Sequence, residues 1–440
     1  MSELAGYKGR SLKLLEDFHV KVGDTVQITM KEGDSATFFD NYVGIIMPRY
    51  ENADDKHVVL KVDSGYNISI ELDRIDKISA MEQKPTKNEK SEQKIKADSK
   101  LPKLLLLSTG GTIASKIDYR TGAVTPTLTA EELNNSIPEL AEIANIETEV
   151  LFSEYSENIM PNHWLEIANK IKNVIQEDNG YHGIIVAHGT DTMHYTSSFL
   201  SFSLAGCPIP IALVGSQRSS DRASSDAALN LIGATEFLVK CKTNGIYVVM
   251  HQDENDEVIA CHLGTRVRKN HTSKRGAFQT IGDDPAFLII NNQIQNNKKT
   301  DFFSNNKFEP KIALDEKVAL VKYYPGFDPE ILQNYIQKEY KAIIFEGTGL
   351  GHVGKNMYSI IKSANEKDIF IGMTSQCIDG RVSMTVYESG RDLLNLGIIP
   401  LEDMIPEVAL TKAMWAAGNS KNSQEIKKIM LNKIASEISK

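Results

Sequence analysis

The chain is poor in cysteine and has no long apolar run. None of its four cysteines stands in a C-x-x-C pair, which argues against a thiolate metal site or a disulfide framework and is typical of a reduced, cytoplasmic protein. No stretch approaches the about 18 apolar residues that a membrane-spanning helix requires. The first residues, Met1–Arg10, lack the apolar core of a signal peptide. We therefore expect an intracellular protein with no membrane partner.

The chain also lacks an excess of positive charge, with 49 lysines and arginines against 58 acidic residues. The formal net charge is −9, which argues against a large electrostatic contact with nucleic acid or with an anionic membrane. RNA handled by a partner protein remains compatible with this charge. The 440 residues are too many for one ordinary domain, and 41% of them are hydrophobic, so two or three domains with substantial cores are expected.

Residues 1–79 read as a small β unit. Short β-rich runs alternate there with turn residues, which predicts a four- or five-stranded barrel of the SH3-like kind. The runs cover residues 24–30, 42–47, 57–62 and 66–72. No catalytic constellation falls within them, so a docking or structural role is favoured for this unit.

Residues 80–100 form the clearest linker. They contain six lysines and four acidic residues with almost no apolar side chain, so they cannot build a packed core. A basic tail that touches RNA is the alternative interpretation. The alternation of lysines with acids favours the plain linker.

From Leu101 onward, apolar runs alternate with segments of helical spacing, which predicts an α/β fold with buried parallel strands. A polar, asparagine-rich connection over residues 291–311 separates two such units. We predict a first α/β domain over 101–295 and a second over 312–440. The predicted architecture is a two-domain body with parallel-rich sheets behind a small barrel.

Two hydroxyl-rich turns stand out, Ser108–Ser115 and Ala187–Thr192. Each follows an apolar run that reads as a buried strand, and we expect each to lead into a helical segment. Ligands of open α/β sheets bind beyond the carboxyl ends of the strands. Both turns are therefore predicted to meet at one rim, where their threonines and aspartate suit a hydroxyl nucleophile better than a thiol or a metal.

Other chemistries fit these turns poorly. Gly111 is followed by Thr112 rather than by the lysine of a phosphate-binding P-loop, and the GxGxxG spacing is missing. His182, His188 and His194 lack acidic or cysteine partners at metal-ligand spacing. His188 is expected to be a structural hydrogen-bonding residue of its turn.

A hydroxyl nucleophile also needs a base and an oxyanion site. A lysine in a closed site can accept a proton when its pKa is lowered. The basic segment after residue 265 offers Arg268, Lys269 and Lys274, and spacing alone does not separate them. A solvated basic surface is the alternative for the whole segment.

These residues resemble the signatures of bacterial-type L-asparaginases. Thr109–Ala114 and His188–Thr192 are similar to the two threonine motifs of that family, and Val267–Thr272 is similar to its lysine segment, which singles out Lys269. Ser156 and Glu157 match its substrate-binding pair. The resemblance covers the chain from about residue 101 onward and implies an asparaginase-like two-domain fold.

The resemblance also implies roles. Thr112 would attack a side-chain amide to give an acyl-enzyme and ammonia, while Thr190, Asp191 and Lys269 handle protons. Asp191 would bind the substrate together with Ser156 and Glu157. The family's flexible lid tyrosine corresponds to Tyr119, although alignment on Gly122 places Ala123 there instead.

The N-terminal unit narrows the resemblance. Val43–Arg49, Lys61–Ile68 and Ser375–Val382 resemble the D-subunit family of archaeal glutamyl-tRNA(Gln) amidotransferases. That resemblance implies ammonia release from glutamine or asparagine for conversion of Glu-tRNA(Gln) to Gln-tRNA(Gln) by a partner, the E subunit of the amidotransferase.

The same resemblance implies further properties of the complex. The partner would use ATP and Mg2+ and contact most of tRNA(Gln), while this chain would need no cofactor or metal. Two copies would form a homodimer within a heterotetramer. A stand-alone L-asparaginase or glutaminase with an accessory domain is the alternative, and a scaffold without chemistry is a third.

Overall fold

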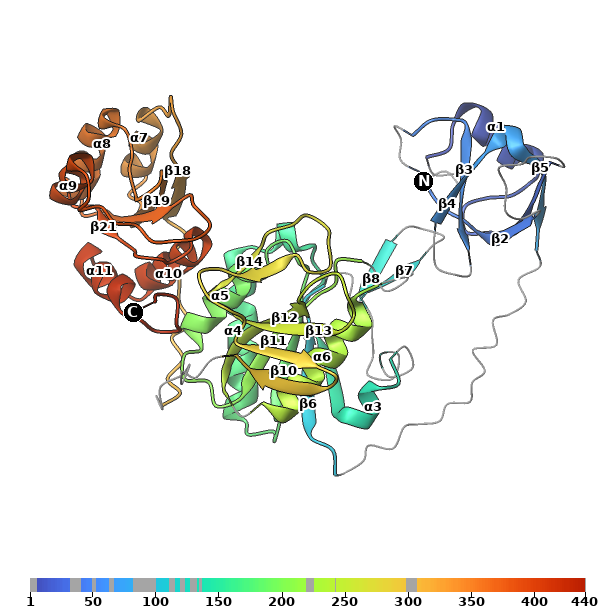
Figure 1. Cartoon of the computed structure of the whole chain (residues 1–440), viewed down its shortest axis with the longest axis horizontal. Helices are drawn as coiled ribbons and strands as arrows, with labels where there is room; N and C mark the ends of the chain where they lie inside the picture. Colours follow the sequence, from blue (N-terminus) through green and yellow to red (C-terminus); the bar gives the residue numbers. More distant parts are fainter. Residues whose placement is uncertain are drawn as a thin grey trace.

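The computed structural model comprises a small β unit followed by a two-part α/β body (Figure 1). This confirms the predicted fold class. Side chains are described for residues 6–31, 41–49, 53–62, 67–81, 100–110, 133, 137–218, 225–241, 243–297 and 307–439, and only the backbone for 115–118 and 123–126.

The N-terminal unit is a five-stranded antiparallel sheet in the order β4-β3-β2-β1-β5. Alternate residues of β1 are buried, as expected for a strand with one face on a core. A helix, α1 (Gly9–Asp17), was not predicted, because its N-cap residue Lys8 provides no side-chain cap and only Ser11 and Leu15 are buried. The strands are β1 (Thr25–Met30), β2 (Asn41–Ile46), β3 (His57–Val62), β4 (Asn67–Glu71) and β5 (Ile75–Ala80).

The first α/β unit contains an eight-stranded sheet in the order β17-β16-β13-β12-β11-β10-β6-β9. Its parallel strands are β6 (Lys103–Ser108), β9 (Asn145–Val150), β10 (Gly183–Ala187), β11 (Pro210–Val214) and β12 (Gly245–His251). Antiparallel strands β13 (Val258–Leu263), β16 (Phe287–Ile290) and β17 (Gln293–Asn296) extend it.

Helices cover both faces of this sheet, which explains the continuous apolar run of β6. Leu105 and Leu107 pack into one core with α4 and α5, whereas Leu104 and Leu106 pack into a second core with α3 and α6. A strand buried on both faces needs apolar side chains at every position. The helices are α3 (Leu140–Ile143), α4 (Pro161–Gln176), α5 (Met193–Ser203) and α6 (Ala227–Lys240).

The second α/β unit is a four-stranded parallel sheet in the order β18-β19-β20-β21. Its strands are β18 (Val318–Lys322), β19 (Ala342–Gly347), β20 (Phe370–Ser375) and β21 (Ile399–Pro400). Its helices are α7 (Glu330–Gln337), α8 (Tyr358–Glu366), α9 (Glu388–Asn395), α10 (Pro406–Gly418) and α11 (Ser423–Leu431).

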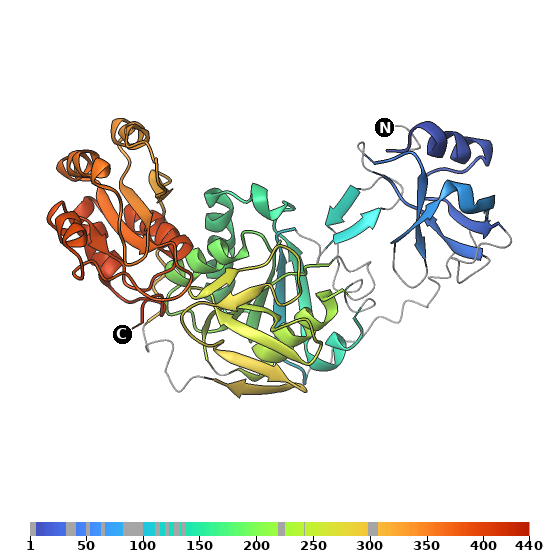
Figure 2. The ribbon, with the colours of Figure 1, turned by 45° about the horizontal axis from the view of Figure 1, so that its top comes forward.

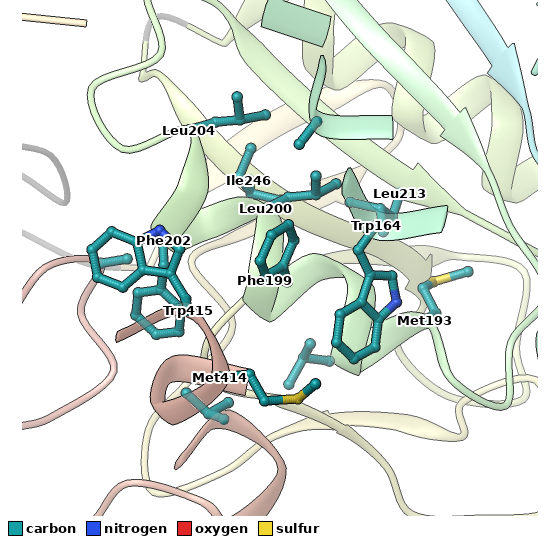
Figure 3. Packing of buried hydrophobic residues seen from close by; sticks show 14 of the residues in the cluster. Trp164, Met193, Phe199, Leu200, Phe202, Leu204, Leu213, Ile246, Met414 and Trp415 are labelled. Atoms are coloured by element: carbon teal, nitrogen blue, oxygen red, sulfur yellow. The ribbon is translucent and has the colours of Figure 1, made fainter. Parts of the chain in front are cut away.

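Helix α10 joins the two units. It is apolar and buried nearly all round, and it packs against α5, where Phe202 stacks on Trp415 with ring centroids 5.9 Å apart (Figure 3). Ser198 and Thr411 share a hydrogen bond of 2.6 Å across the same contact. Figures 1 and 2 place the second unit, in orange and red, at the α5 side of the first.

The two hydroxyl-rich turns lead to different structures. The second turn enters helix α5, as predicted. The first turn does not: it enters an antiparallel hairpin of β7 (Ser115–Asp118) and β8 (Ala123–Pro126), so the predicted helix was wrong. Gly122 between two short runs is a hairpin signal that the prediction missed. Tyr119 lies between these strands and outside the described residues.

None of the described helices is long and apolar enough to cross a membrane.

A fully buried ion pair fixes the last described segment. The Lys412 amine lies 2.5 Å from Glu437 Oε1 and also donates to the carbonyl oxygens of Met430 and Asn432, while Glu437 accepts the backbone N–H of Ala435. Burial lowers the pKa of Lys412, and the Glu437 carboxylate opposes this shift. Removing one partner of such a pair leaves an uncompensated buried charge.

We therefore expect Lys412→Met to lower the free energy of unfolding by about 3–5 kcal/mol. The double variant Lys412→Met/Glu437→Gln removes the stranded charge and should be less destabilised than the single variant. Urea midpoints of the two variants measure this difference. Lys362→Met breaks an exposed pair with Glu366 and should cost less than about 1 kcal/mol. Equal losses at both sites would contradict the prediction.

Candidate active site

The two turns meet at one edge of the main sheet, as predicted. Strands β6 and β10 are parallel neighbours, and Ser108 is paired with Ala187 at their carboxyl ends. The backbone N–H and hydroxyl of Thr109 both donate to the Ala187 carbonyl, at 3.0 and 2.9 Å. Gly110 then bends the chain with φ of +107°, where a Cβ would lie 2.4 Å from the Glu154 carbonyl oxygen. Thr112, which follows, lies outside the described residues.

His188 holds the second turn together. Its buried ring contacts the Thr196 hydroxyl through Nε2 at 2.9 Å and the Gly189 carbonyl through Nδ1 at 2.6 Å. Burial lowers its pKa to about 4, and the contact with Gly189 offsets only part of the shift. A neutral imidazole committed to these two contacts is the structural residue that the sequence predicted.

Ser156 also holds this turn, through contacts with Asp191 and Thr192. It begins a short 3-10 helix, η3 (Ser156–Asn158), and its hydroxyl accepts the backbone N–H of Asp191 at 3.2 Å. The Thr192 hydroxyl donates to the Ser156 carbonyl at 2.6 Å. A Cβ on Gly189 would lie 2.8 Å from Ser156 Cβ, so the close packing requires glycine there. Glu157 follows and is exposed.

Lys269 reaches this turn from a separate short strand, β14 (Val267–Lys269). Its amine donates to Thr190 Oγ1 at 2.8 Å and to Asp191 Oδ1 at 2.6 Å. The Lys269 side chain is 9% exposed, whereas that of Asp191 is 64% exposed. The structure thus distinguishes Lys269, which contacts the turn, from Arg268, whose Nε lies 3.0 Å from Glu407 Oε1.

These three side chains form a continuous path of hydrogen bonds. A threonine hydroxyl, an amine and a carboxylate are joined in that order, so a proton has a route among them. Bonds to charged groups are stronger than bonds between neutral ones, and the amine is mostly shielded from water. The arrangement is suited to proton transfer beside a hydroxyl nucleophile.

A third loop, after β11, packs against Thr190. A Cβ on Gly215 would lie 2.8 Å from Thr190 Cγ2 and 2.7 Å from the His188 carbonyl oxygen. The fully buried Asp226 carboxylate accepts the backbone N–H groups of Gln217 and Arg218, each at 3.0 Å. Sequence reasoning missed Asp226, although an acidic residue just before α6 is a helix-start signal.

The structure thus brings together Ser156, Thr190, Asp191 and Lys269 among the predicted site residues. Thr112 and Tyr119 lie outside the described part of the chain. Within that part, no group of three or more His, Cys, Asp or Glu side chains is arranged to hold a metal ion.

Three family models match the chain. The GatD N-terminal domain matches residues 20–81, the asparaginase N-terminal domain 103–302, and the glutaminase/asparaginase C-terminal domain 317–430. The D subunit of glutamyl-tRNA(Gln) amidotransferase from Pyrococcus abyssi is 44% identical over 431 residues, which cover 97% of each chain. That of Methanopyrus kandleri is 43% identical over 446 residues, covering 100% of this chain and 96% of the relative. The chain belongs to the D-subunit family of glutamyl-tRNA(Gln) amidotransferases.

Two solved L-asparaginase structures have the same fold as the α/β body of this chain. The thermostable L-asparaginase from Thermococcus kodakarensis has a TM-score of 0.69 and 35% identity, and the match covers 77% of this chain and 99% of that one. L-asparaginase I from Vibrio cholerae has a TM-score of 0.67 and 25% identity over the same shares. The resemblance to both families is thereby confirmed.

Buried histidines predict sensitivity to acid. Burial lowers the pKa of His188 to about 4 and those of His194 and His262 to about 3. Their unfolded pKa is about 6.5, so below that pH the unfolded chain binds more protons than the folded one. The free energy of unfolding should therefore fall as the pH drops from about 6.5 toward 3.

His262 lies away from the threonine turns, on β13, and contacts the Thr280 hydroxyl at 2.8 Å. We expect His262→Gln to reduce the pH slope of the unfolding free energy by one proton, about 1.4 kcal/mol per pH unit. Urea unfolding at a series of pH values between 7 and 4 measures that slope. The exposed His182→Gln is the control. An unchanged slope in His262→Gln would show that its protonation does not contribute.

Proposed function

We propose that this chain is the amidase component of a tRNA-dependent amidotransferase in the cytoplasm. It releases ammonia from glutamine, or asparagine, for conversion of Glu-tRNA(Gln) to Gln-tRNA(Gln) with a partner, the E subunit. The observation that carries the proposal is the path from Thr190 through Lys269 to Asp191, at the rim where strands β6 and β10 end and both threonine turns begin. Membership of the D-subunit family and the separate N-terminal unit support the amidotransferase role.

In the proposed reaction, the Thr112 hydroxyl attacks the side-chain amide carbonyl of the substrate. The C–N bond breaks, the leaving nitrogen takes a proton and departs as ammonia, and the acyl group remains as an ester on Thr112. Water then cleaves the ester and releases the free amino acid. Thr190, Lys269 and Asp191 handle protons in both steps. Backbone N–H groups of the glycine-bent turns stabilise the oxyanion.

The proposed substrate-binding residues are Ser156, Glu157 and Asp191. The Asp191 side chain keeps 64% of its surface exposed while one oxygen contacts Lys269, so its carboxylate has room for the α-ammonium group of an amino acid. Ser156 and the exposed Glu157 stand beside the same turn. Tyr119 is proposed as the lid.

The remaining chemistry belongs to the partner. ATP and Mg2+ act in the E subunit, and this chain uses no cofactor or metal of its own. The net charge of −9 favours contact with tRNA(Gln) mainly through the partner. Two copies form a homodimer within a heterotetramer.

The second candidate is a stand-alone asparaginase or glutaminase. It is favoured by the match to the Thermococcus L-asparaginase, which spans 99% of that chain. This candidate predicts rapid hydrolysis of asparagine or glutamine without the E subunit and without any response to tRNA. It leaves the N-terminal unit as an accessory domain.

The test uses the complex of the full chain with the E subunit. Thr112→Val and Lys269→Met should each lower Gln-tRNA(Gln) formation from glutamine by about 10³-fold or more, because nucleophile and proton handling act as a unit. Supplied ammonium should restore the wild-type rate in both variants. Lys274→Met, a neighbouring lysine, should change neither rate.

Two outcomes would contradict the proposal. Normal glutamine-dependent amidation in Lys269→Met would show that Lys269 has no part in the reaction. Rapid hydrolysis by the chain alone, with no Gln-tRNA(Gln) formed when the E subunit is present, would favour the stand-alone enzyme.

A further inference from the structure

Side chains of strand β14, which includes Lys269, contact both α/β units. Successive side chains of a strand point to opposite faces, so residues two apart share a face. Val267 is fully buried in a core to which both units contribute, and Lys269 reaches Thr190 on the first unit. Arg268, on the opposite face of β14, contacts the second unit, and so does Arg266 in the turn just before the strand.

The Arg266 guanidinium is committed to the second unit. Its side chain is 3% exposed. Nη1 donates to Asp403 Oδ2 at 2.9 Å, Nε to the Ser436 carbonyl at 2.8 Å and Nη2 to the Ser439 hydroxyl at 3.1 Å. The planar fork of arginine fixes direction as well as distance, which a lysine at this position would not do.

Arg268 adds a second attachment two residues further on. Its Nε lies 3.0 Å from Glu407 Oε1, and the Glu407 side chain, in the first turn of α10, is 8% exposed. An ion pair shielded in this way holds its partners more firmly than one at the surface.

The backbone of β14 has few other supports. It pairs only with β15 (Phe278–Thr280), in a two-stranded sheet separate from the eight-stranded one, among the strands that the structure describes. The ladder that aligns β6 with β10 therefore does not place Lys269. Figure 1 shows β14 at the side of the first unit where α5 and α10 lie.

The segment 432–439, which Arg266 contacts, is held by hydrogen bonds of its own. Glu437 is held by Lys412, the Thr265 hydroxyl donates to the Ala435 carbonyl at 2.6 Å, and the Ser439 N–H donates to Asp403 Oδ1 at 2.8 Å. The anchor is thus rigid.

We propose that Arg266 and Arg268 are positioning residues that fix Lys269 through the second unit, so that this unit and the segment 432–439 form part of the support of the active site. This proposal rests on the role of Lys269 in the proposed function. Displacement of the lysine by about 1 Å is enough to cost about 10²-fold in rate.

The test is a double-mutant cycle on the pair Arg268 and Glu407, with ammonia release from glutamine measured in the complex with the E subunit. Arg268→Gln and Glu407→Gln should each lower kcat about 10- to 100-fold, with KM changed by less than about twofold. The double variant should lose no more than either single, because both remove the same interaction. Arg268→Lys should recover part of kcat, and it replaces Arg268→Gln if that variant does not fold.

A matched control separates positioning of Lys269 from general loosening of the contact between the units. Ser198→Ala removes a hydrogen bond to Thr411, between α5 and α10, that involves neither β14 nor Glu407. It should keep wild-type kcat. Equal losses in the control and test variants, or additive losses in the cycle, would overturn the proposal.

Lys269→Met distinguishes the two possible failures. If it is inactive while Arg268→Gln and Glu407→Gln keep wild-type kcat, only the positioning proposal fails. If Lys269→Met itself is fully active, the assignment of the site fails and the positioning proposal fails with it.

Discussion

The contact of one amine with two side chains of the same turn is the interaction on which the site depends. Lys269 must bring its charge to 2.8 Å from Thr190 and 2.6 Å from Asp191 while remaining mostly shielded from water. This demands a turn of fixed shape. Ser156 and His188 provide it by binding the backbone and side chains around that turn.

The fold delivers the two halves of this contact by different means. The turn is placed by a regular parallel ladder, in which Ser108 and Ala187 end side by side. The lysine is placed by side-chain contacts that cross between two units, through Arg266 and Arg268. Many backbone hydrogen bonds fix the position of the turn. The position of Lys269 depends instead on the two ion pairs of Arg266 and Arg268.

The same difference explains how much the sequence could predict. The apolar run Leu104–Leu107 and the glycine-bent turns are local patterns, and the parallel sheet with its shared rim follows from them. Lys269 and Thr190 are 79 positions apart in the sequence, and hydrophobic periodicity does not predict a contact over that separation. Only the resemblance to a family singled out Lys269. Arg266, whose side-chain partners lie at least 137 positions away, was missed for the same reason. The helix expected after the first turn was wrong because a short hairpin and a helical turn differ little in apolar pattern.

Trapping of a covalent intermediate shows whether Thr112 is the nucleophile and whether it needs Lys269. The intact complex is mixed with glutamine, quenched in acid within the first turnover, and digested for mass spectrometry. We expect a γ-glutamyl ester on the peptide that contains Thr112 in the unaltered chain, and none in Lys269→Met. A γ-glutamyl group on any other side chain, or an equal yield of the Thr112 ester without Lys269, would contradict this expectation.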